Sequence, residues 1–164
     1  MDVFIMRHGK AEHTRQGHND TDRELTKKGR EEIIAVADWM TVRGLQFDLI
    51  AASPLARAQE TAAIIADRLN EADKLITWDV LVPGGNPDTV CGEIERHADA
   101  GAILLVGHEP LLSSLISRII AGHVGAGIFM TKGALAKIRN FSFRVCPSGE
   151  LHWLITAKQL AGIR

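Results

Sequence analysis

The chain has 164 residues, of which 46% are hydrophobic, and its formal net charge at pH 7 is -1. A chain of this length can bury one full core and leaves little for a second, so we interpret residues 1–164 as a single domain. Basic and acidic residues are nearly matched and are spread along the sequence, which excludes a nucleic-acid-binding stripe or a basic membrane-surface patch.

The first element that we expect is a buried strand at the N-terminus. Residues 3–5 are apolar, and the run stops at Met6-Arg7-His8-Gly9, as a strand that ends in a tight turn does. Ligands of open α/β sheets bind beyond the carboxyl ends of such strands. Arg7 offers a planar fork suited to phosphate, and a neutral His8 could act as a nucleophile, a base or a metal ligand. The polar, aperiodic residues 10–24 predict a loop over this end of the sheet.

Two helices with a strand between them are expected next. Thr26 can cap the first helix, and Gly44 is suited to its C-terminal end. Residues 47–52 form an apolar run that predicts a buried strand. Ser53-Pro54 combines an N-cap residue with a proline suited to the first helical position, so the second helix should start there, with Arg57 in its first turn.

The second half of the chain repeats this strand–turn–helix pattern. Residues 75–82 predict a third strand, which Pro83-Gly84-Gly85 breaks, and Asn86-Pro87 starts another helix. Residues 102–106 are the most continuous apolar run, which is typical of a central strand. This strand should end at Gly107-His108-Glu109-Pro110, where Pro110 opens a helix.

The C-terminal part of the chain predicts a hairpin. Two alternating segments, roughly residues 134–145 and 150–156, flank Pro147-Ser148-Gly149. A hairpin of this kind would lie at the edge of the sheet.

Strands that alternate with helices indicate an α/β fold. We expect a three-layer α/β/α sandwich with a mainly parallel central sheet. Since the carboxyl ends of parallel strands meet at one edge, His8, Arg57 and His108 should converge there. The helix N-terminus at Arg57 adds backbone donors and a positive dipole, so the sequence predicts a phosphate pocket.

Four motifs carry a resemblance to a known family. They are Arg7-His8-Gly9 after the first strand, Arg23-Glu24-Leu25-Thr26-Lys27-Lys28-Gly29 at a helix start, Ser53-Pro54-Leu55-Ala56-Arg57-Ala58-Gln59-Glu60-Thr61-Ala62, and Val106-Gly107-His108-Glu109-Pro110. In this order, over residues 1 to about 120, they resemble the histidine phosphatase superfamily, also called phosphoglycerate mutase-like. The chain lacks room for the insertions that many members carry over the site, and in this it is similar to the SixA-type phosphohistidine phosphatases.

The resemblance implies a role for each site residue. His8 would be the nucleophile that forms a phosphohistidine intermediate, Arg7 and Arg57 would grip the phosphoryl oxygens, and Gly9 and His108 would complete the phosphate site. Phosphoryl transfer needs an in-line nucleophile and positive donors for the equatorial oxygens, so neither a metal nor another cofactor is required. We expect phosphate or sulfate to bind in this pocket. His8 must attack as a neutral imidazole, whereas His108 is more useful protonated.

The general acid is not assigned by the sequence. Many family members protonate a leaving alcohol with a carboxylate from the region after the third strand, and here that region, residues 79–85, holds only Asp79, which is not convincingly placed. A phosphorylated imidazole can leave without such an acid, because its other nitrogen can carry a proton at neutral pH. This favours phosphohistidine in a signalling or phosphotransfer protein as the substrate. Glu12, His13 and His18 stay open as helpers.

Three functions remain open at this point. The first is a hydrolase acting on a phosphoprotein such as a histidine phosphotransfer domain, the second is a small-molecule phosphatase or phosphoglycerate mutase-like enzyme, and the third is a phosphohistidine-binding module without turnover. A small metabolite is usually enclosed by inserted loops, while a phosphoprotein needs an open site. We therefore expect residues 10–24 and 81–88 to form an open mouth.

Rival chemistries and locations fit less well. Cys91 and Arg96 are separated by four residues, where cysteine phosphatases need five, and Asp20-Thr21-Asp22 is interpreted as a solvated loop. Cys91 and Cys146 lie far apart without CxxC spacing, which favours free thiols in a reducing compartment. No apolar run is long enough for a signal or a membrane span. We expect a cytoplasmic protein that binds neither nucleic acid nor membranes.

Overall fold

The computed structural model describes residues 1–13 and 19–162, and within them it forms a six-stranded sheet of order β3-β2-β4-β1-β5-β6. The strands are β1 (Asp2–Arg7), β2 (Leu49–Ala52), β3 (Leu75–Thr77), β4 (Ala102–Gly107), β5 (Leu135–Phe143) and β6 (Pro147–Ile155). The four strands from β3 to β1 are parallel, and β5 and β6 are antiparallel to their neighbours.

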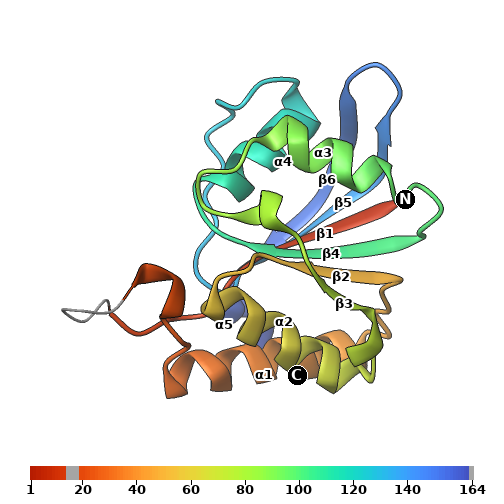
Figure 1. The fold of residues 1–164 in the computed structure, drawn as a ribbon. Helices are drawn as coiled ribbons and strands as arrows, with labels where there is room; N and C mark the ends of the chain where they lie inside the picture. The colour runs from red at the N-terminus through yellow and green to blue at the C-terminus, as the bar shows by residue number, and fades with distance from the viewer. Residues whose placement is uncertain (14–18, 163–164) are drawn as a thin grey trace.

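Five α-helices cover the two faces of this sheet (Figure 1). They are α1 (Lys27–Val42), α2 (Ala56–Leu69), α3 (Pro87–Glu95), α4 (Leu111–Ala121) and α5 (Ala157–Gly162). Helices α3 and α4 pack on one face, and α1, α2 and α5 pack on the other. The predicted three-layer α/β/α sandwich with a mainly parallel sheet is confirmed. The interpretation of residues 1–164 as one domain stays a prediction.

The apolar runs are continuous because both faces of the central strands are buried. In β1, Val3 and Ile5 pack against the α3–α4 side, whereas Phe4 and Met6 pack against the α1–α2 side. The adjacent strand β4 divides its apolar residues between the two faces in the same way. Successive side chains of a strand point to opposite faces, so a strand between two helix layers needs apolar residues at every position. The prediction that residues 102–106 form a central strand is confirmed, since β4 lies between β1 and β2.

The start of α1 packs directly on the chain that follows His8. Thr26 caps the helix by accepting a hydrogen bond from the Gly29 N–H at 2.9 Å, and its own N–H donates to the Lys10 carbonyl at 2.9 Å. A Cβ at Gly29 would lie 2.1 Å from that same carbonyl oxygen. Leu25-Thr26-Lys27-Lys28-Gly29, the leucine-threonine-x-x-glycine part of the second motif, is therefore a packing motif, which fixes the segment beyond His8 against α1.

The start of α2 differs from the prediction. The helix begins at Ala56 with Leu55 as its N-cap, and not at Ser53-Pro54. The Ser53 N–H instead donates to the Val106 carbonyl at 3.0 Å, which continues the pairing of β2 with β4 for one more residue. Ser53 is thus held by the sheet, and its side chain is available for another contact. Arg57 still lies in the first turn of α2, as expected.

Three other boundaries also differ. Strand β3 stops at Thr77 because the chain then turns into a 3₁₀ turn, Asp79–Leu81, which buries Trp78 and Leu81 in the core. Helix α4 starts at Leu111, with Pro110 as its N-cap. In the hairpin, Phe143 pairs with Pro147, so Pro147-Ser148-Gly149 belongs to β6 and the turn precedes it. Helix α3 begins at Pro87 with Asn86 as its cap, as predicted.

Among the helices of the described residues, none combines the length and the apolar character that crossing a membrane would require.

Gly29→Ala should destabilise the fold by about 1–3 kcal/mol, because the new methyl group would overlap a backbone oxygen that cannot move freely. Gly92→Ala is the matched control, since Gly92 lies inside α3 and nothing lies within 4 Å of the added Cβ. That variant should be neutral or slightly more stable, because alanine is the better helix former. The free energy of unfolding in urea measures both. Equal stability of the two variants would contradict this role of Gly29.

Candidate active site

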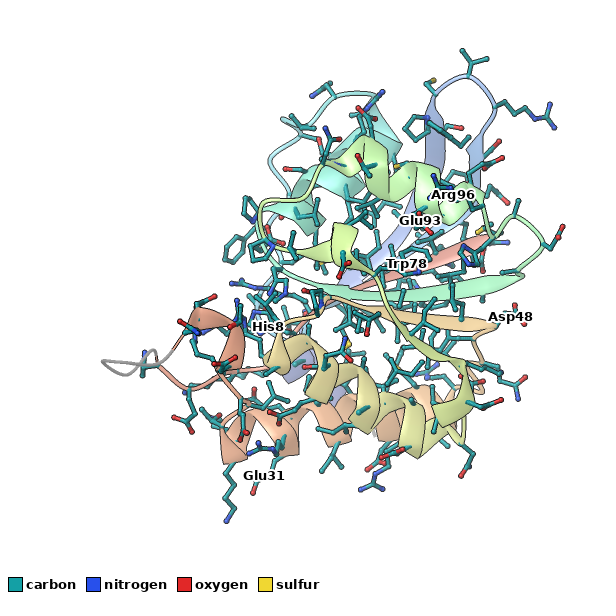
Figure 2. All side chains as sticks on the ribbon, viewed as in Figure 1. His8, Glu31, Asp48, Trp78, Glu93 and Arg96 are labelled. Carbon is teal, nitrogen blue, oxygen red and sulfur yellow. The ribbon has the colours of Figure 1, made fainter. Side chains whose placement is uncertain are left out.

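The carboxyl edge of the parallel strands brings the predicted site residues together. His8 follows β1, His108 follows β4, and Arg57 lies in the first turn after β2. The ring centroids of His8 and His108 are 5.0 Å apart, which lets both imidazoles contact one phosphate-sized anion. His8 is 5% exposed, His108 is 2% exposed and Arg57 is 4% exposed. Together with Arg7 they line a cavity of about 330 Å³, which we call the catalytic pocket. Figure 2 shows His8 at this edge of the sheet, with Asp48 at the opposite edge.

The hydrogen bond of His8 to the next residue sets its tautomer. Nδ1 lies 2.7 Å from the Gly9 carbonyl oxygen, and because a carbonyl only accepts, Nδ1 carries the proton. Nε2 therefore has a free lone pair. Burial, together with the positive charges of Arg57 and Arg7, lowers the pKa of His8 to about 3. At neutral pH His8 is thus an unprotonated imidazole, as a nucleophile must be.

Gly9 positions this histidine but does not line the catalytic pocket. Its N–H donates to the Thr61 hydroxyl at 3.1 Å, and that hydroxyl donates to the Arg57 carbonyl at 2.7 Å. A Cβ at Gly9 would lie 2.8 Å from the Ile33 side chain of α1. The prediction that Gly9 binds phosphate finds no support in this geometry, because its donor is already used within the fold.

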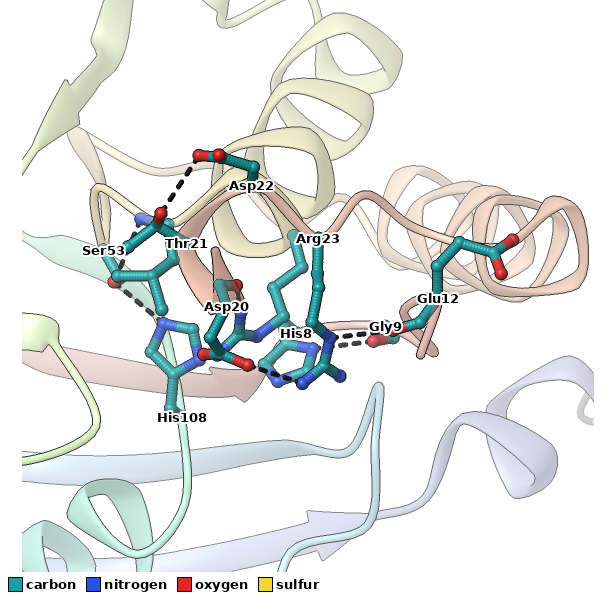
Figure 3. A network of polar contacts seen from close by, with 11 residues as sticks. His8, Gly9, Glu12, Asp20, Thr21, Asp22, Arg23, Ser53 and His108 are labelled. Carbon is teal, nitrogen blue, oxygen red and sulfur yellow. Dashed lines mark hydrogen bonds and ion pairs between the residues drawn. The ribbon is translucent and has the colours of Figure 1, made fainter. Parts of the chain in front are cut away.

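His108 is fixed from the other side of the pocket by Ser53. Its Nε2 lies 2.8 Å from the Ser53 hydroxyl, while Nδ1 is buried without a hydrogen-bond partner among the described residues. Figure 3 shows the His108 ring with Ser53 on one side and with Asp20 and His8 on the other. When the serine donates to Nε2, Nδ1 carries the proton and can donate to a bound oxygen. Ser53 is a site residue that sequence reasoning treated only as a helix cap.

His108 is neutral near neutral pH, which differs from the expectation that it is protonated. Burial and the neighbouring Arg57 lower the pKa of His108 to about 4, while Asp20 opposes this shift. Sequence reasoning missed the effect because the extent of burial is a property of the packed fold. A phosphoryl dianion between His8 and His108 would raise both pKa values by Coulomb attraction.

The two arginines are held differently. Arg7 donates from Nη1 to the Met130 carbonyl at 2.7 Å, and burial lowers its pKa while Glu109 opposes that shift. Arg57 donates from Nη1 to the Asp20 carbonyl at 2.7 Å and from Nη2 to the Asp20 carboxylate at 3.0 Å. The Nε atoms of both arginines are buried without a partner in the described part of the chain. The guanidinium group of Arg57 is thus already bound to a carboxylate of the protein itself, that of Asp20.

Asp20 and Arg23 are site residues that the sequence did not reveal. The Asp20 carboxylate also accepts from Arg23 Nη1 at 2.7 Å, and Arg23 Nε donates to the Glu12 carbonyl at 2.7 Å (Figure 3). The pKa of Asp20 is lowered by its hydrogen bonds to Arg23 and Arg57, so Asp20 is ionised at neutral pH. Residues 20–22 are exposed, as expected of a solvated segment, and the Asp20 side chain is 53% exposed, but its carboxylate also binds both arginines.

Two further charged residues line the catalytic pocket, Glu109 and Lys132. Ser113 donates to Glu109 Oε2, while Oε1 is buried and unpartnered within the described residues. The sequence signal that could have identified Glu109 as a pocket residue is its position directly after His108. The carboxyl edge also receives Pro83 from the segment after β3, so both predicted mouth segments border the pocket.

Three of the remaining candidates from the sequence, Asp79, Glu12 and His13, do not line the catalytic pocket. Asp79 is exposed in the 3₁₀ turn after β3, and neither Glu12 nor His13 lines the catalytic pocket. His18 lies outside the described residues. Within residues 1–13 and 19–162, no group of three or more His, Cys, Asp or Glu side chains is placed to hold a metal ion.

Comparison with known proteins gives consistent matches. Residues 3–82 match the model of the histidine phosphatase superfamily, branch 1. The chain is 31% identical to the phosphohistidine phosphatase SixA homolog of Haemophilus influenzae, over 73% of this chain and 77% of that protein. It is 28% identical to phosphohistidine phosphatase SixA of Escherichia coli K12, over 84% of each chain. The chain belongs to the histidine phosphatase superfamily.

A solved structure of the protein histidine phosphatase SixA complexed with tungstate superposes with a TM-score of 0.87 at 25% identity. The match covers 98% of this chain and 99% of that one. The predicted resemblance to the SixA-type members of the histidine phosphatase superfamily is confirmed, and so is the prediction that the protein is a phosphatase. The four motifs that carried the resemblance are the segments that place His8, α1, Arg57 and His108.

The pH dependence of stability should report the two buried histidines. Their pKa values, about 3 and about 4, lie below the 6.5 of an unperturbed histidine, so the unfolded chain binds more protons between these limits. The free energy of unfolding should therefore keep the whole contribution of the two histidines above pH 6.5. It should fall as pH drops towards 4, by about 1.4 kcal/mol per pH unit for each histidine.

The double variant His8→Gln/His108→Gln should flatten this dependence between pH 6.5 and pH 4.5, as measured by urea unfolding. The control is His152→Gln at an exposed strand position, which should keep the wild-type slope. A double variant with an unchanged slope would show that other groups carry the dependence.

Asp20→Asn should tighten the binding of inorganic phosphate, because the Asp20 carboxylate competes with phosphate for the donors of Arg57. We expect the inhibition constant of phosphate to fall about tenfold, which corresponds to about 1.4 kcal/mol. Asp22→Asn is the control, since the Asp22 carboxylate accepts a hydrogen bond from Thr21, whereas Arg23 and Arg57 pair with Asp20. Weaker phosphate binding in Asp20→Asn would instead make Asp20 a residue that positions Arg57.

Proposed function

We propose that the protein hydrolyses the P–N bond of phosphohistidine in a phosphoprotein, through a covalent phosphohistidine on its own His8. The observation that carries the proposal is the state of His8: a neutral, buried imidazole with its Nε2 lone pair free in a pocket that Arg7, Arg57 and His108 also line. Such a set supplies an in-line nucleophile and positive donors, which are the main requirements of phosphoryl transfer.

In the first step, His8 Nε2 attacks the phosphorus, and the bond from phosphorus to the substrate imidazole breaks. The departing imidazole keeps the proton on its other nitrogen and takes the electron pair of the broken bond, so it leaves neutral. Arg7 and Arg57 stabilise the charge on the equatorial oxygens, and His108 donates to one of them. Asp20 must release the fork of Arg57 for this, and Arg23 remains as its partner.

In the second step, water attacks the phosphorus of phosphorylated His8. The P–N bond breaks, and His8 regains its free Nε2 as inorganic phosphate forms. The Nδ1–H bond to the Gly9 carbonyl holds the ring in one orientation through both steps, which keeps attack and departure in line.

Asp20, one of the two carboxylates that line the pocket, supports an imidazole leaving group. An alcohol would need a proton donor, and Asp20 is ionised and bound to two arginines. The segment after β3, from which many family members provide the acid, brings only Pro83 to the pocket. An imidazole leaving group needs no such donor.

The relatives support the same substrate, since two of them are named phosphohistidine phosphatases. The solved structure holds tungstate, which supports phosphate or sulfate as a ligand of this pocket. A histidine phosphotransfer domain fits a pocket bordered by Asp20, Arg23 and Pro83 at the protein surface. We also propose a cytoplasmic location, which the free thiols of Cys91 and Cys146 support.

A second candidate function is the hydrolysis of a small phosphate monoester, which Glu109 favours. Its Oε1 is buried without a partner in the described residues, and Glu109 lines the catalytic pocket together with Arg7 and Arg57. In this function Glu109 would be the general acid for a leaving alcohol. A binding module without turnover has less support, because the lone pair of His8 is free and its imidazole is neutral.

His8→Ala should abolish turnover of a phosphohistidine protein, whereas Arg57→Ala and His108→Ala should keep a slow reaction. Loss of the nucleophile removes the covalent route, while loss of one donor costs roughly 2.7–4 kcal/mol of transition-state stabilisation. The measurement is release of inorganic phosphate, together with labelled enzyme after a quench without acid, since the P–N bond is acid-labile. Label on a residue other than His8, or full activity of His8→Ala, would refute the mechanism.

Glu109→Gln separates the two candidate functions. With an imidazole leaving group, the variant should keep most of its kcat on a phosphohistidine protein. With an alkyl phosphate it should lose about a hundredfold or more if Glu109 is the acid. Glu24→Gln, at an exposed position outside the pocket, is the control for the loss of one carboxylate. Loss on the phosphohistidine protein of the same size as on the alkyl phosphate would count against the phosphohistidine proposal.

A further inference from the structure

A second cavity lies directly beside the catalytic pocket. Its volume is about 830 Å³, against about 330 Å³ for the catalytic pocket, and Arg7 and Lys132 line both. The rest of its charged lining consists of Lys10, Lys28, Lys158 and Glu32. We call this cavity the lysine groove. A substrate whose phosphoryl group contacts Arg7 can extend into the lysine groove without crossing another surface.

Positive charge is concentrated in the lysine groove. Five cations and one carboxylate give it four net positive charges, whereas the whole chain has a formal net charge of -1, so the remainder carries five net negative charges. Within the part of the chain that the structure describes, Lys10, Lys132 and Lys158 make no ion pair. Lys28 lies 3.9 Å from Glu32, which is at the outer limit of an ion pair.

The cations of the lysine groove act on one another. Burial lowers the pKa of Lys132, and the nearby charges of Arg7, Arg23 and Lys10 lower it further. This means that Lys132 lies in a positive field that its own protein does not neutralise. A ligand with several negative charges would relieve the repulsion among these groups.

The chemistry of the lysine groove fits a protein segment better than one small anion. Lysine ammonium groups are mobile point charges that accept carboxylates in many geometries, whereas a tightly held phosphate is usually met by arginine forks. The groove also presents the ring of Phe129, which is 73% exposed and offers an apolar contact. Nucleic acid would require a longer basic track, and the rest of this chain is net negative.

We propose that the lysine groove docks an acidic segment of the phosphoprotein substrate, next to the phosphohistidine that enters the catalytic pocket. This inference rests on the proposed function and extends it to the choice among phosphoproteins. Carboxylates of the segment contact the lysines, and an apolar side chain of the segment contacts Phe129. Complementary charge steers the encounter and lowers KM, while the chemical step stays with His8.

The test uses two synthetic phosphohistidine peptides of equal length, one flanked by Asp, Glu and a Leu and the other by Ser and Ala. Wild-type enzyme should have a kcat/KM at least about tenfold higher for the acidic peptide at low salt, and the preference should shrink as salt rises. Lys28→Glu/Lys158→Glu should reduce the ratio of the two values to one or below. Lys27→Glu is the matched control, because Lys27 is exposed at the start of α1 and lies outside the lining. It should keep most of the preference.

A binding measurement keeps the inference independent of turnover. The acidic peptide without phosphate, labelled with a fluorophore, should bind the wild-type enzyme by anisotropy and lose about tenfold or more in affinity in Lys28→Glu/Lys158→Glu. Equal affinity in both enzymes would overturn the docking proposal. So would an RNA oligonucleotide that competes better than the acidic peptide.

The outcomes separate the two proposals. Turnover of both peptides at equal rates, with equal binding, would overturn the docking proposal and leave the phosphohistidine activity standing. Turnover of an aryl phosphate with neither peptide hydrolysed would overturn the proposed function, and the anisotropy result would still decide whether the groove binds acidic segments.

Discussion

The parallel pairing of β1 with β4 is the constraint on which the active site depends. Its register places Arg7 opposite Gly107, and the His8 N–H donates to the Gly107 carbonyl at 3.0 Å. His8 and His108 therefore leave the sheet side by side, from strands that are a hundred residues apart in the sequence. A shift of the register by one residue would turn one of these histidines to the other face of the sheet. The apolar side chains of both strands prevent this shift, because each face is buried under helices.

Burial at the sheet edge then determines the protonation states. Removing the two imidazoles from water and placing them beside Arg7 and Arg57 disfavours their charged forms. This arrangement lowers the stability of the fold at acidic pH. It also keeps His8 neutral without a dedicated general base. The orientation of the ring is fixed by the Gly9 carbonyl; the Gly9 N–H is held by Thr61, and Ile33 leaves no room for a side chain at Gly9. The imidazole that we propose as the nucleophile is thus kept neutral and oriented by packing and backbone contacts.

One side of the pocket is bordered by Asp20 and Arg23, which belong to the polar residues 19–23. Asp20 and Arg23 are held there by ion pairs and by hydrogen bonds to backbone carbonyls. The leucine-threonine-x-x-glycine motif ends this segment and anchors it on the Lys10 carbonyl. One side of the pocket is therefore held by charge pairs, while the sheet side is held by buried packing. The Arg23–Asp20 ion pair is partly exposed, and exposed ion pairs contribute little stability, so this side of the pocket is held less firmly than the sheet side.

The sequence by itself determined the layers, the central strand, the cap at Thr26 and the convergence of His8, Arg57 and His108. These follow from local signals, namely apolar runs, cap residues and the rule that carboxyl ends of parallel strands share an edge. The resemblance of four motifs added the roles, and matched relatives confirmed the family. Only the tertiary structure decided that Asp20 binds Arg57 and that Ser53 contacts His108 instead of capping α2. It also decided that both histidines are neutral. Each of these depends on distance and burial between residues that are far apart in sequence, and no local pattern records them.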